Sequence, residues 1–148
     1  PAALAEAARE CGPAAAIELP DGSIETGKTS NLLGASAALL LNAVKALGNI
    51  PHGTHLISPT AIEPIQKLKV DYLGSKNPRL PTDEVLIALS MCAATDPDAQ
   101  KALDQLSKLK GCQAHTSVIL SRVDIRTFKT LGVELTSEPI YEHQKLYH

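Results

Sequence analysis

Residues 26–48, TGKTSNLLGASAALLLNAVKALG, decide the fold that this sequence predicts. Between Leu32 and Leu47 the long polar side chains are Asn42 and Lys45, and most of the other residues are leucine, alanine or valine. A helix that is apolar on almost all sides is a buried helix, and each fully buried leucine contributes roughly 1.5 to 3 kcal/mol to stability. We therefore expect packing layers on both sides of this helix.

Polar residues and a glycine mark the two ends of the predicted helix. Thr29 or Ser30 can accept a hydrogen bond from the free amides of the first turn, and Gly48 can close the last turn in a left-handed conformation. Before the helix, Thr26 is expected to end a strand, and Gly27 is expected to turn the chain into the hydrophobic centre.

Strands and helices alternate on both sides of this stretch. Upstream, Asp21 and Gly22 are the dipeptide that best closes a hairpin between two short strands. The predicted elements are strands at 14–19 and 23–26, a strand at 54–57, a helix from 58 to about 69, a loop at 72–80, helices at 82–94 and 96–111, a strand at 112–120, a helix at 124–131 and a strand at 133–137. This order predicts an α/β fold, a three-layer α/β/α sandwich with a mixed sheet that opens with a β-hairpin.

The 148 residues suffice for one domain, which we place at residues 13–148. Residues 1–12 are interpreted as the end of a helix or linker that begins upstream, because the chain starts at Pro1 in an alanine-rich helical pattern. We therefore expect an upstream domain in the same chain.

The composition argues against several functional classes. The net charge of −2 comes from scattered charges, so no nucleic-acid groove or membrane surface is predicted, and four aromatic residues provide no base-stacking platform. The longest apolar run is too short to cross a bilayer. The cysteines Cys11, Cys92 and Cys112 are far apart and in apolar surroundings, which indicates the reduced thiols of a cytoplasmic protein.

Gly22, Gly27, Lys28 and Thr29 match G-x-x-x-x-G-K-T, the pattern of a phosphate-binding loop. Such a loop requires a strand that ends before its first glycine, followed by loop residues. Here residues 21–22 form a turn and residues 23–26 alternate like a strand. We therefore interpret the match as coincidental.

Two polar segments are candidates for a site that binds a small anion. Lys28, Thr29 and Ser30 lie at the predicted start of the buried helix, where free amides and the helix dipole attract anions; a plain helix cap with a solvated lysine is the alternative. The second segment leads into another predicted helix start, and the alternative is a charged loop that ties itself together. Its residues are Lys76, Asn77, Arg79, Thr82, Asp83 and Glu84.

His115 stands in a polar run inside an otherwise apolar strand. It is a candidate general base or ligand-binding residue, although a lone histidine at such a position is more often a satisfied core group. His143 and His148 have no cysteine or carboxylate cluster at ligand spacing, so no metal site is predicted.

The hairpin that leads through a glycine into a buried helix is similar to the opening of the cytidine-deaminase-like fold. In that family the first helix carries His or Cys, any residue, then Glu, and a Pro-Cys-x-x-Cys completes a zinc site. Here Gly34, Ala35 and Ser36 stand on the predicted helix, and the cysteine pair is missing. The resemblance therefore implies the fold without the zinc chemistry.

A second resemblance covers the whole chain. It rests on long stretches that include ELPDG at 18–22, TGKTS at 26–30, LLGASAALLLNA at 32–43, IEPIQKLK at 62–69, KNPRL at 76–80, TDEVLIALS at 82–90 and KLYH at 145–148. These resemble the carboxy-terminal domain of the bacterial family called domain of unknown function 1846. Two positions depart from the family pattern: Pro81 replaces a histidine, which puts in doubt any reaction needing that histidine, and Ser137 replaces a cysteine, which weakens any thiol mechanism.

Two functional hypotheses follow. In the first, this domain forms one wall of a site for a small ligand with a phosphate or carboxylate group, shared with the upstream domain. In the second, it is a non-catalytic structural domain that holds the upstream domain or builds a homo-oligomer. Neither hypothesis identifies a cofactor or a catalytic residue.

Overall fold

The sheet has four strands in the order β2-β1-β3-β4. They are β1 (Ala14–Glu18), β2 (Ile24–Lys28), β3 (Gln113–Thr116) and β4 (Glu134–Ser137). β1 is antiparallel to β2 and β3, and β4 is parallel to β3, so the sheet is mixed as predicted. The computed structural model describes residues 14–117 and 120–137. The predicted helix end or linker at residues 1–12, the thiol of Cys11 and the tail from residue 138 lie outside these ranges.

The hairpin between β1 and β2 has the local structure that its turn residues predict. Asp21 Oδ1 accepts hydrogen bonds from the backbone N–H and the hydroxyl of Ser23 at 2.9 and 2.6 Å. Gly22 has a φ of 87°, a conformation that a glycine adopts without strain. β2 continues to Lys28, two residues beyond the predicted end at Thr26, so residues 24–28 form a strand and not a phosphate-binding loop.

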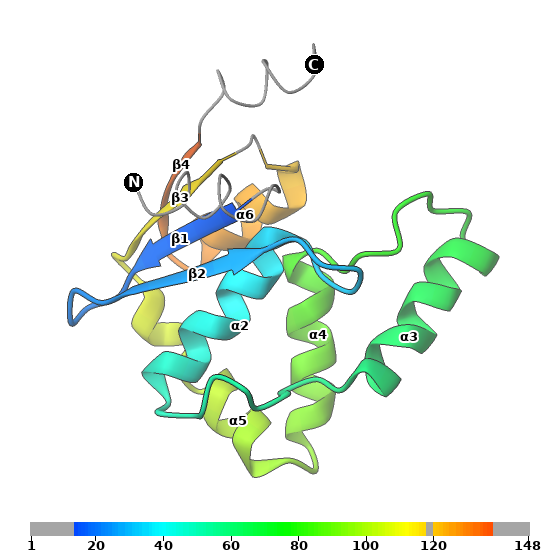
Figure 1. Ribbon diagram of the computed structural model, residues 1–148, viewed down its shortest axis with the longest axis horizontal. Coiled ribbons are helices and arrows are strands. Elements are labelled where there is room, and N and C mark those ends of the chain that lie inside the picture. Colours follow the sequence, from blue (N-terminus) through cyan, green and yellow to red (C-terminus); the bar gives the residue numbers. More distant parts are fainter. Residues whose placement is uncertain (1–13, 118–119, 138–148) are drawn as a thin grey trace.

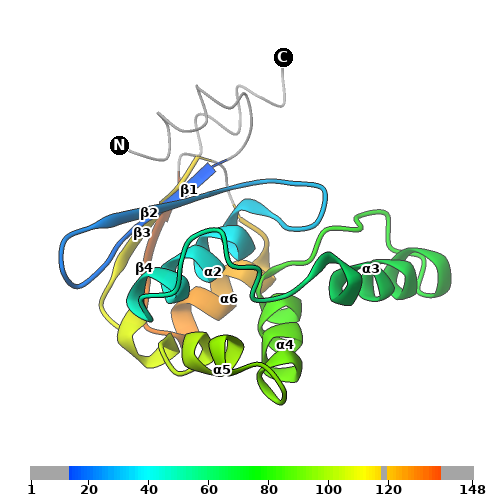
Figure 2. The same cartoon turned by 60° about the horizontal axis from the view of Figure 1, so that its bottom comes forward.

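Helices and short helical segments connect the strands. They are α2 (Ala35–Leu47), α3 (Pro59–Lys67), the π-helical segment η1 (Leu68–Tyr72), α4 (Thr82–Ala93), α5 (Pro97–Leu103), the 3-10 segment η2 (Leu106–Leu109) and α6 (Arg122–Thr130). Figures 1 and 2 show α2, α4, α5 and α6 on the same side of the sheet. This is an α/β fold, and among the described residues no helix forms the predicted third layer.

α2 is the buried helix that the sequence predicts. Leu39, Leu40 and Val44 are almost fully buried in a core that also contains Ile17 of β1. Gly27 of β2 explains how closely this helix approaches the sheet. A Cβ atom at Gly27 would lie 2.7 Å from the Ala35 carbonyl oxygen and would also overlap the Leu39 backbone, so only glycine fits beneath the helix.

The predicted start of α2 was wrong. The helix begins at Ala35, because Leu33 forms an isolated parallel bridge with Leu80 and the Leu80 N–H donates to the Leu32 carbonyl at 3.0 Å. Residues 29–34 are thereby held outside the helix. Pairing with a segment far away in sequence has replaced the local helical hydrogen bonds.

Two predicted strands and one predicted helix also differ from the structure. Residues 54–57 form an irregular segment and not a strand, since Lys45 Nζ donates to the His52 and Thr54 carbonyls at 2.8 and 3.3 Å and holds the segment against α2. β3 ends at Thr116 in the described residues, and residues 118–119 of the longer predicted strand lie outside them. The predicted helix at 96–111 divides into α5 and η2.

α3 and η1 form an arm that stands away from the body of the molecule (Figures 1 and 2). They pack mainly against each other. α3 continues through Pro64, and two side chains anchor the arm. Gln66 Nε2 donates to the Asn31 carbonyl at 3.0 Å, and Lys69 Nζ donates to the Arg79 carbonyl at 2.8 Å.

Candidate functional site

The loop after β2 and the loop before α4 meet at a depression of about 520 Å³. We call it the Arg79 depression. Its lining includes Thr29, Asn77, Arg79 and Glu84 from the predicted site residues. The two polar segments that the sequence singled out therefore come together in space, although nearly fifty positions separate Ser30 from Arg79.

Arg79 links the two loops. Its Nε–H donates to the carbonyl oxygen of Ser30 at 2.5 Å, and its backbone N–H donates to Asn77 Oδ1 at 3.0 Å. The carbonyl oxygen of Arg79 accepts from Lys69 Nζ. The bond from Nε holds the guanidinium group at the wall of the depression, and the other two hold the backbone of Arg79.

Lys69 and Glu84 form an ion pair at 2.9 Å across the depression. The Lys69 side chain is 14% exposed and that of Glu84 is 33% exposed, so the pair is partly shielded from water. Each charge offsets the other. Arg79 makes no ion pair with any carboxylate among the described residues, which leaves it as the cation that could receive a ligand anion.

Asp124 occupies the amino end of α4. Its Oδ1 accepts hydrogen bonds from the backbone N–H and the hydroxyl of Thr82 at 3.0 and 2.8 Å. Thr82, one of the predicted site residues, is the first residue of this helix and receives its cap from α6. Because a carboxylate of the chain already lies at this helix end, the helix dipole is less available to an external anion.

The other predicted residues lie outside this lining. Ser30 Oγ accepts from the N–H groups of Leu32 and Leu33 at 3.2 and 3.1 Å, so it caps a turn and not α2. Lys28 ends β2 and is exposed, seven positions before the first residue of α2. Lys28 and Ser30 therefore do not mark a helix start as predicted.

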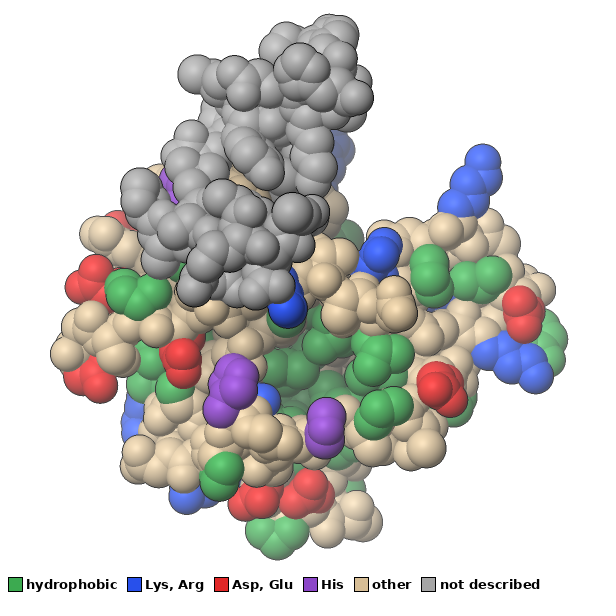
Figure 3. All heavy atoms as spheres, in the orientation of Figure 1, with side chains coloured by type: hydrophobic (Ala, Val, Ile, Leu, Met, Phe, Trp, Pro, Cys, Tyr) green, Lys and Arg blue, Asp and Glu red, His purple; other side chains and the backbone are tan. Residues whose placement is uncertain are grey.

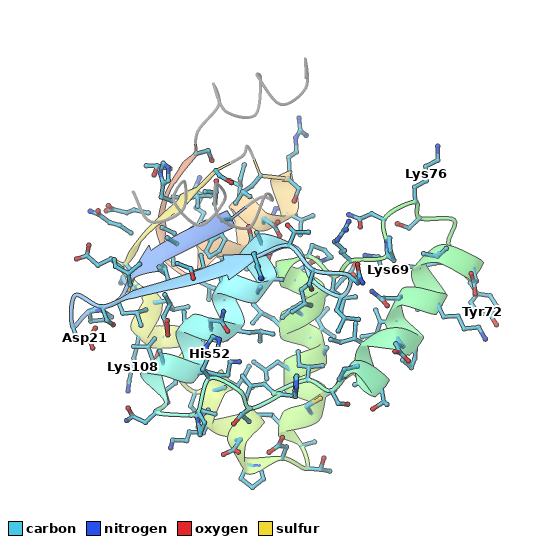
Figure 4. All side chains as sticks on the ribbon, in the orientation of Figure 1. Asp21, His52, Lys69, Tyr72, Lys76 and Lys108 are labelled. Carbon is cyan, nitrogen blue, oxygen red and sulfur yellow. The ribbon has the colours of Figure 1, made fainter. Side chains whose placement is uncertain are left out.

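Two charged residues of the second segment point to solvent. Asp83 is exposed and accepts from the N–H of Glu84 at 2.8 Å. Lys76 is exposed on the outer loop, and Figure 4 shows it extending away from the body, whereas Lys69 lies on the side of the arm that faces α4. Lys76 and Asp83 are therefore not part of the Arg79 depression.

His115 lies in β3 and lines a different hollow, on the sheet face that does not carry the helices. Its Nδ1 is 2.7 Å from Thr136 Oγ1, and the two residues are partners in the parallel β3–β4 register. The structure does not bring His115 to the Arg79 depression. Within residues 14–117 and 120–137, no group of three or more His, Cys, Asp or Glu side chains could hold a metal ion.

Sequence reasoning missed Lys69 and Asp124, which both line the depression. Ser121 followed by Asp124 fits a helix-capping pattern, and Ser121 Oγ accepts from the Asp124 N–H at 3.2 Å. That pattern could have placed Asp124 at the start of α6, but not beside Thr82. Nothing near Lys69 in the sequence indicated that it would line the depression.

None of the helices in the described part of the chain has the length and apolar composition needed to cross a membrane.

The chain resembles one group of bacterial proteins along nearly its whole length. The family model described as "Domain of unknown function DUF1846, C-terminal" matches residues 1–147. A UPF0371 protein of Corynebacterium diphtheriae is 61% identical over 135 residues, which cover 91% of this chain and 27% of that protein. UPF0371 proteins of Corynebacterium urealyticum and Streptococcus pyogenes are 60% and 50% identical with the same coverage. The chain thus spans about a quarter of the length of these relatives.

Proposed function

Because the chain belongs to the family described as domain of unknown function DUF1846, through the C-terminal domain of that family, we propose that it forms one wall of a small-ligand site. The ligand carries a phosphate or a carboxylate group. It binds at the Arg79 depression, and a second domain supplies the opposite wall.

The observation that carries this proposal is the position of Arg79. Its guanidinium is held at the meeting point of the two polar loops and has no carboxylate partner among the described residues. A guanidinium can present two parallel N–H donors to a phosphate or carboxylate, and such charge-assisted bonds are about twice as strong as neutral ones. Thr29 and Asn77 add polar groups to the same wall.

The size and openness of the depression support a shared site. Its volume of about 520 Å³ lies within the range of roughly 300 to 1,000 Å³ that is usual for small-molecule sites. The much greater length of the relatives supports the proposal that a second domain closes the depression. Sites between domains are common for small ligands.

Isothermal titration calorimetry with inorganic phosphate and with acetate tests the proposal in the full-length protein. Arg79→Met should weaken anion binding about tenfold, the effect of losing roughly 1.4 kcal/mol from a charge-assisted bond. Lys76→Met is the matched control, because it removes a cation from the same loop that does not line the depression. Equal affinity in the wild type and Arg79→Met would refute the proposal.

A second candidate function is a structural domain that builds a homo-oligomer or holds another domain. It is favoured by the apolar side chains of the arm, where Leu68 is 49% exposed and Tyr72 and Leu73 are each 72% exposed. Ile87 and Met91 of α4 are 60% and 71% exposed and lie one helical turn apart. Several large apolar side chains exposed on neighbouring elements are typical of interaction surfaces.

Light scattering distinguishes this candidate from the first. The double variant Tyr72→Ser/Leu73→Ser should reduce the assembled mass of the full-length protein without weakening phosphate binding. If the mass is unchanged by this variant and also by Ile87→Ser/Met91→Ser, these surfaces do not build the oligomer and the structural candidate fails.

The finer features of the fold belong to the same proposal. A three-layer, cytidine-deaminase-like arrangement is supported by the hairpin that leads into α2 and by the burial of Ala14 and Ala16, whose side chains lie on the sheet face away from the helical core. We place the protein in the cytoplasm, since Cys92 and Cys112 are free thiols. A structure of the full-length protein that leaves this sheet face open to solvent would exclude the third layer.

A further inference from the structure

A second, smaller hollow of about 150 Å³ lies between α2 and the segment that joins α2 to α3. Its walls are mainly aliphatic and include Leu33, Leu41, Leu56 and Ile62. Figure 3 shows hydrophobic side chains gathered in a recess near the centre of this face of the molecule. We call it the Lys45 hollow.

Lys45 gives the apolar hollow one cationic group. α2 places Ala38, Leu41 and Lys45 on one face, because they are three or four residues apart. Two of the three N–H donors of the ammonium group are accounted for by the carbonyls of His52 and Thr54. One N–H donor of Lys45 is left for a further acceptor.

The charge of Lys45 is only partly compensated by the protein. It makes no ion pair among the described residues, and Glu25 is the acidic group whose charge acts on it from farther away. Burial lowers the pKa of the Lys45 amine, and the attraction of Glu25 opposes that effect in part. An anion bound beside Nζ would stabilise the charged amine.

We propose that the Lys45 hollow binds the anion of a small aliphatic carboxylic acid. The carboxylate accepts the remaining hydrogen bond of Lys45 Nζ, and the hydrocarbon chain contacts Leu41, Leu56 and Ile62. A cavity of about 150 Å³ admits a molecule the size of benzene, so a chain of about four to six carbons fits. The neighbouring amide of Asn42 does not compete for this ligand, because it donates to the Thr26 carbonyl at 2.8 Å.

This site differs in chemistry from the Arg79 depression. The Arg79 depression is lined mainly by polar and charged side chains, whereas the walls of the Lys45 hollow are mainly aliphatic, with polar groups from Asn42, Lys45, Thr54 and His55. A phosphate ester would leave its polar oxygens against the aliphatic walls without hydrogen-bond partners, which is costly. A monocarboxylate with an apolar chain satisfies both the cation and the walls.

Titration of the ¹⁵N-labelled chain with hexanoate, hexan-1-ol and acetate, followed by amide chemical shifts, tests this inference. Hexanoate should shift the amides of Leu41, Lys45 and Leu56 in a saturable way. Hexan-1-ol should bind about tenfold more weakly, because it lacks the charge that Lys45 pairs with, and acetate should produce no saturable shift of these three amides. Hexanoate that shifts none of these amides would overturn the proposal.

Variants separate this site from the proposed function. Lys45→Met keeps the apolar stem and removes the charge, so it should abolish the preference for hexanoate over hexan-1-ol, whereas Lys45→Arg should retain it. Arg79→Met should leave hexanoate affinity within about twofold, which the independence of separate sites predicts. If Arg79→Met weakens hexanoate binding and Lys45→Met does not, the carboxylate binds at the Arg79 depression and the inference is wrong.

Discussion

The carboxylate of Asp124 accepts two hydrogen bonds from Thr82, one from the backbone N–H at 3.0 Å and one from the hydroxyl at 2.8 Å. Asp124 belongs to the first turn of α6 and Thr82 is the first residue of α4. The contact therefore joins the amino ends of two helices that are 42 positions apart. Asp124 also lines the Arg79 depression.

Asp124→Ala should lower the free energy of unfolding by about 1 to 3 kcal/mol, since it removes a charged helix cap and leaves the buried Thr82 donors without a partner. Asp83→Ala is the matched control, because that carboxylate is exposed and bonds only the next residue. Urea denaturation measures both. Similar losses in the two variants would contradict this role of Asp124.

Gly27→Ala should destabilise the fold by about 3 kcal/mol or more, because the new Cβ meets the backbone of α2, which can move only as a whole. Gly34→Ala is the control: its φ is −71° and no atom lies within 4 Å of the position that its Cβ would take. Thermal and urea denaturation should show a nearly unchanged Gly34→Ala protein. A stable Gly27→Ala protein would mean that α2 does not press on β2.

The Lys69–Glu84 pair should contribute coupling energy of about 1 kcal/mol or less, as is usual for ion pairs that are only partly shielded from water. A double-mutant cycle with Lys69→Met and Glu84→Gln isolates this value from the separate bond of Lys69 to the Arg79 carbonyl. The coupling should weaken in high salt. Strictly additive single variants would show that the pair contributes nothing to stability.

Stability should depend on alkaline pH through Cys112. Burial raises the pKa of the Cys112 thiol above its ordinary value of 9.0, and the charge of Glu18 adds to the shift. As the pH rises through about 9, the unfolded chain loses this proton first, so the folded state binds more protons and the free energy of unfolding falls. Urea denaturation near pH 7 and pH 10 should show a smaller loss for Cys112→Ala than for the wild type.

Cys92→Ala serves as the control for that comparison, because it retains the buried Cys112 thiol. It should lose as much stability as the wild type over the same pH interval. If Cys112→Ala loses as much as the other two proteins, the alkaline sensitivity comes from other groups.

The features that were predicted correctly depend on neighbours in sequence. Asp21 closes the hairpin through bonds to Ser23, and the helix predicted from residue 96 begins there because Asp96 accepts from the Asp98 N–H at 2.9 Å. Gly27 was also predicted to lie where the chain meets the hydrophobic centre. A helix that is apolar on nearly all sides must be buried, so α2 was identified without knowledge of its partners.

The features that were predicted wrongly depend on residues far apart in sequence. The start of α2 is displaced by the Leu33–Leu80 bridge, and the apolar run Leu56 and Ile57 is buried against α2 without pairing as a strand. The Arg79 depression was anticipated in part, because Asn77, Arg79 and Glu84 stand together in the sequence. Asp124 and Lys69 reach it only through tertiary contacts, which no local pattern reveals.

The close packing of Gly27 under α2 also limits what four matching letters in an eight-residue pattern can mean. In this chain the second glycine of G-x-x-x-x-G-K-T is needed for the fit of a strand beneath a helix, and the first for a hairpin turn. Pattern searches that score letters alone will return this domain as a false nucleotide binder. A check on whether a helix backbone lies over the second glycine would separate such domains from genuine ATP- and GTP-binding proteins.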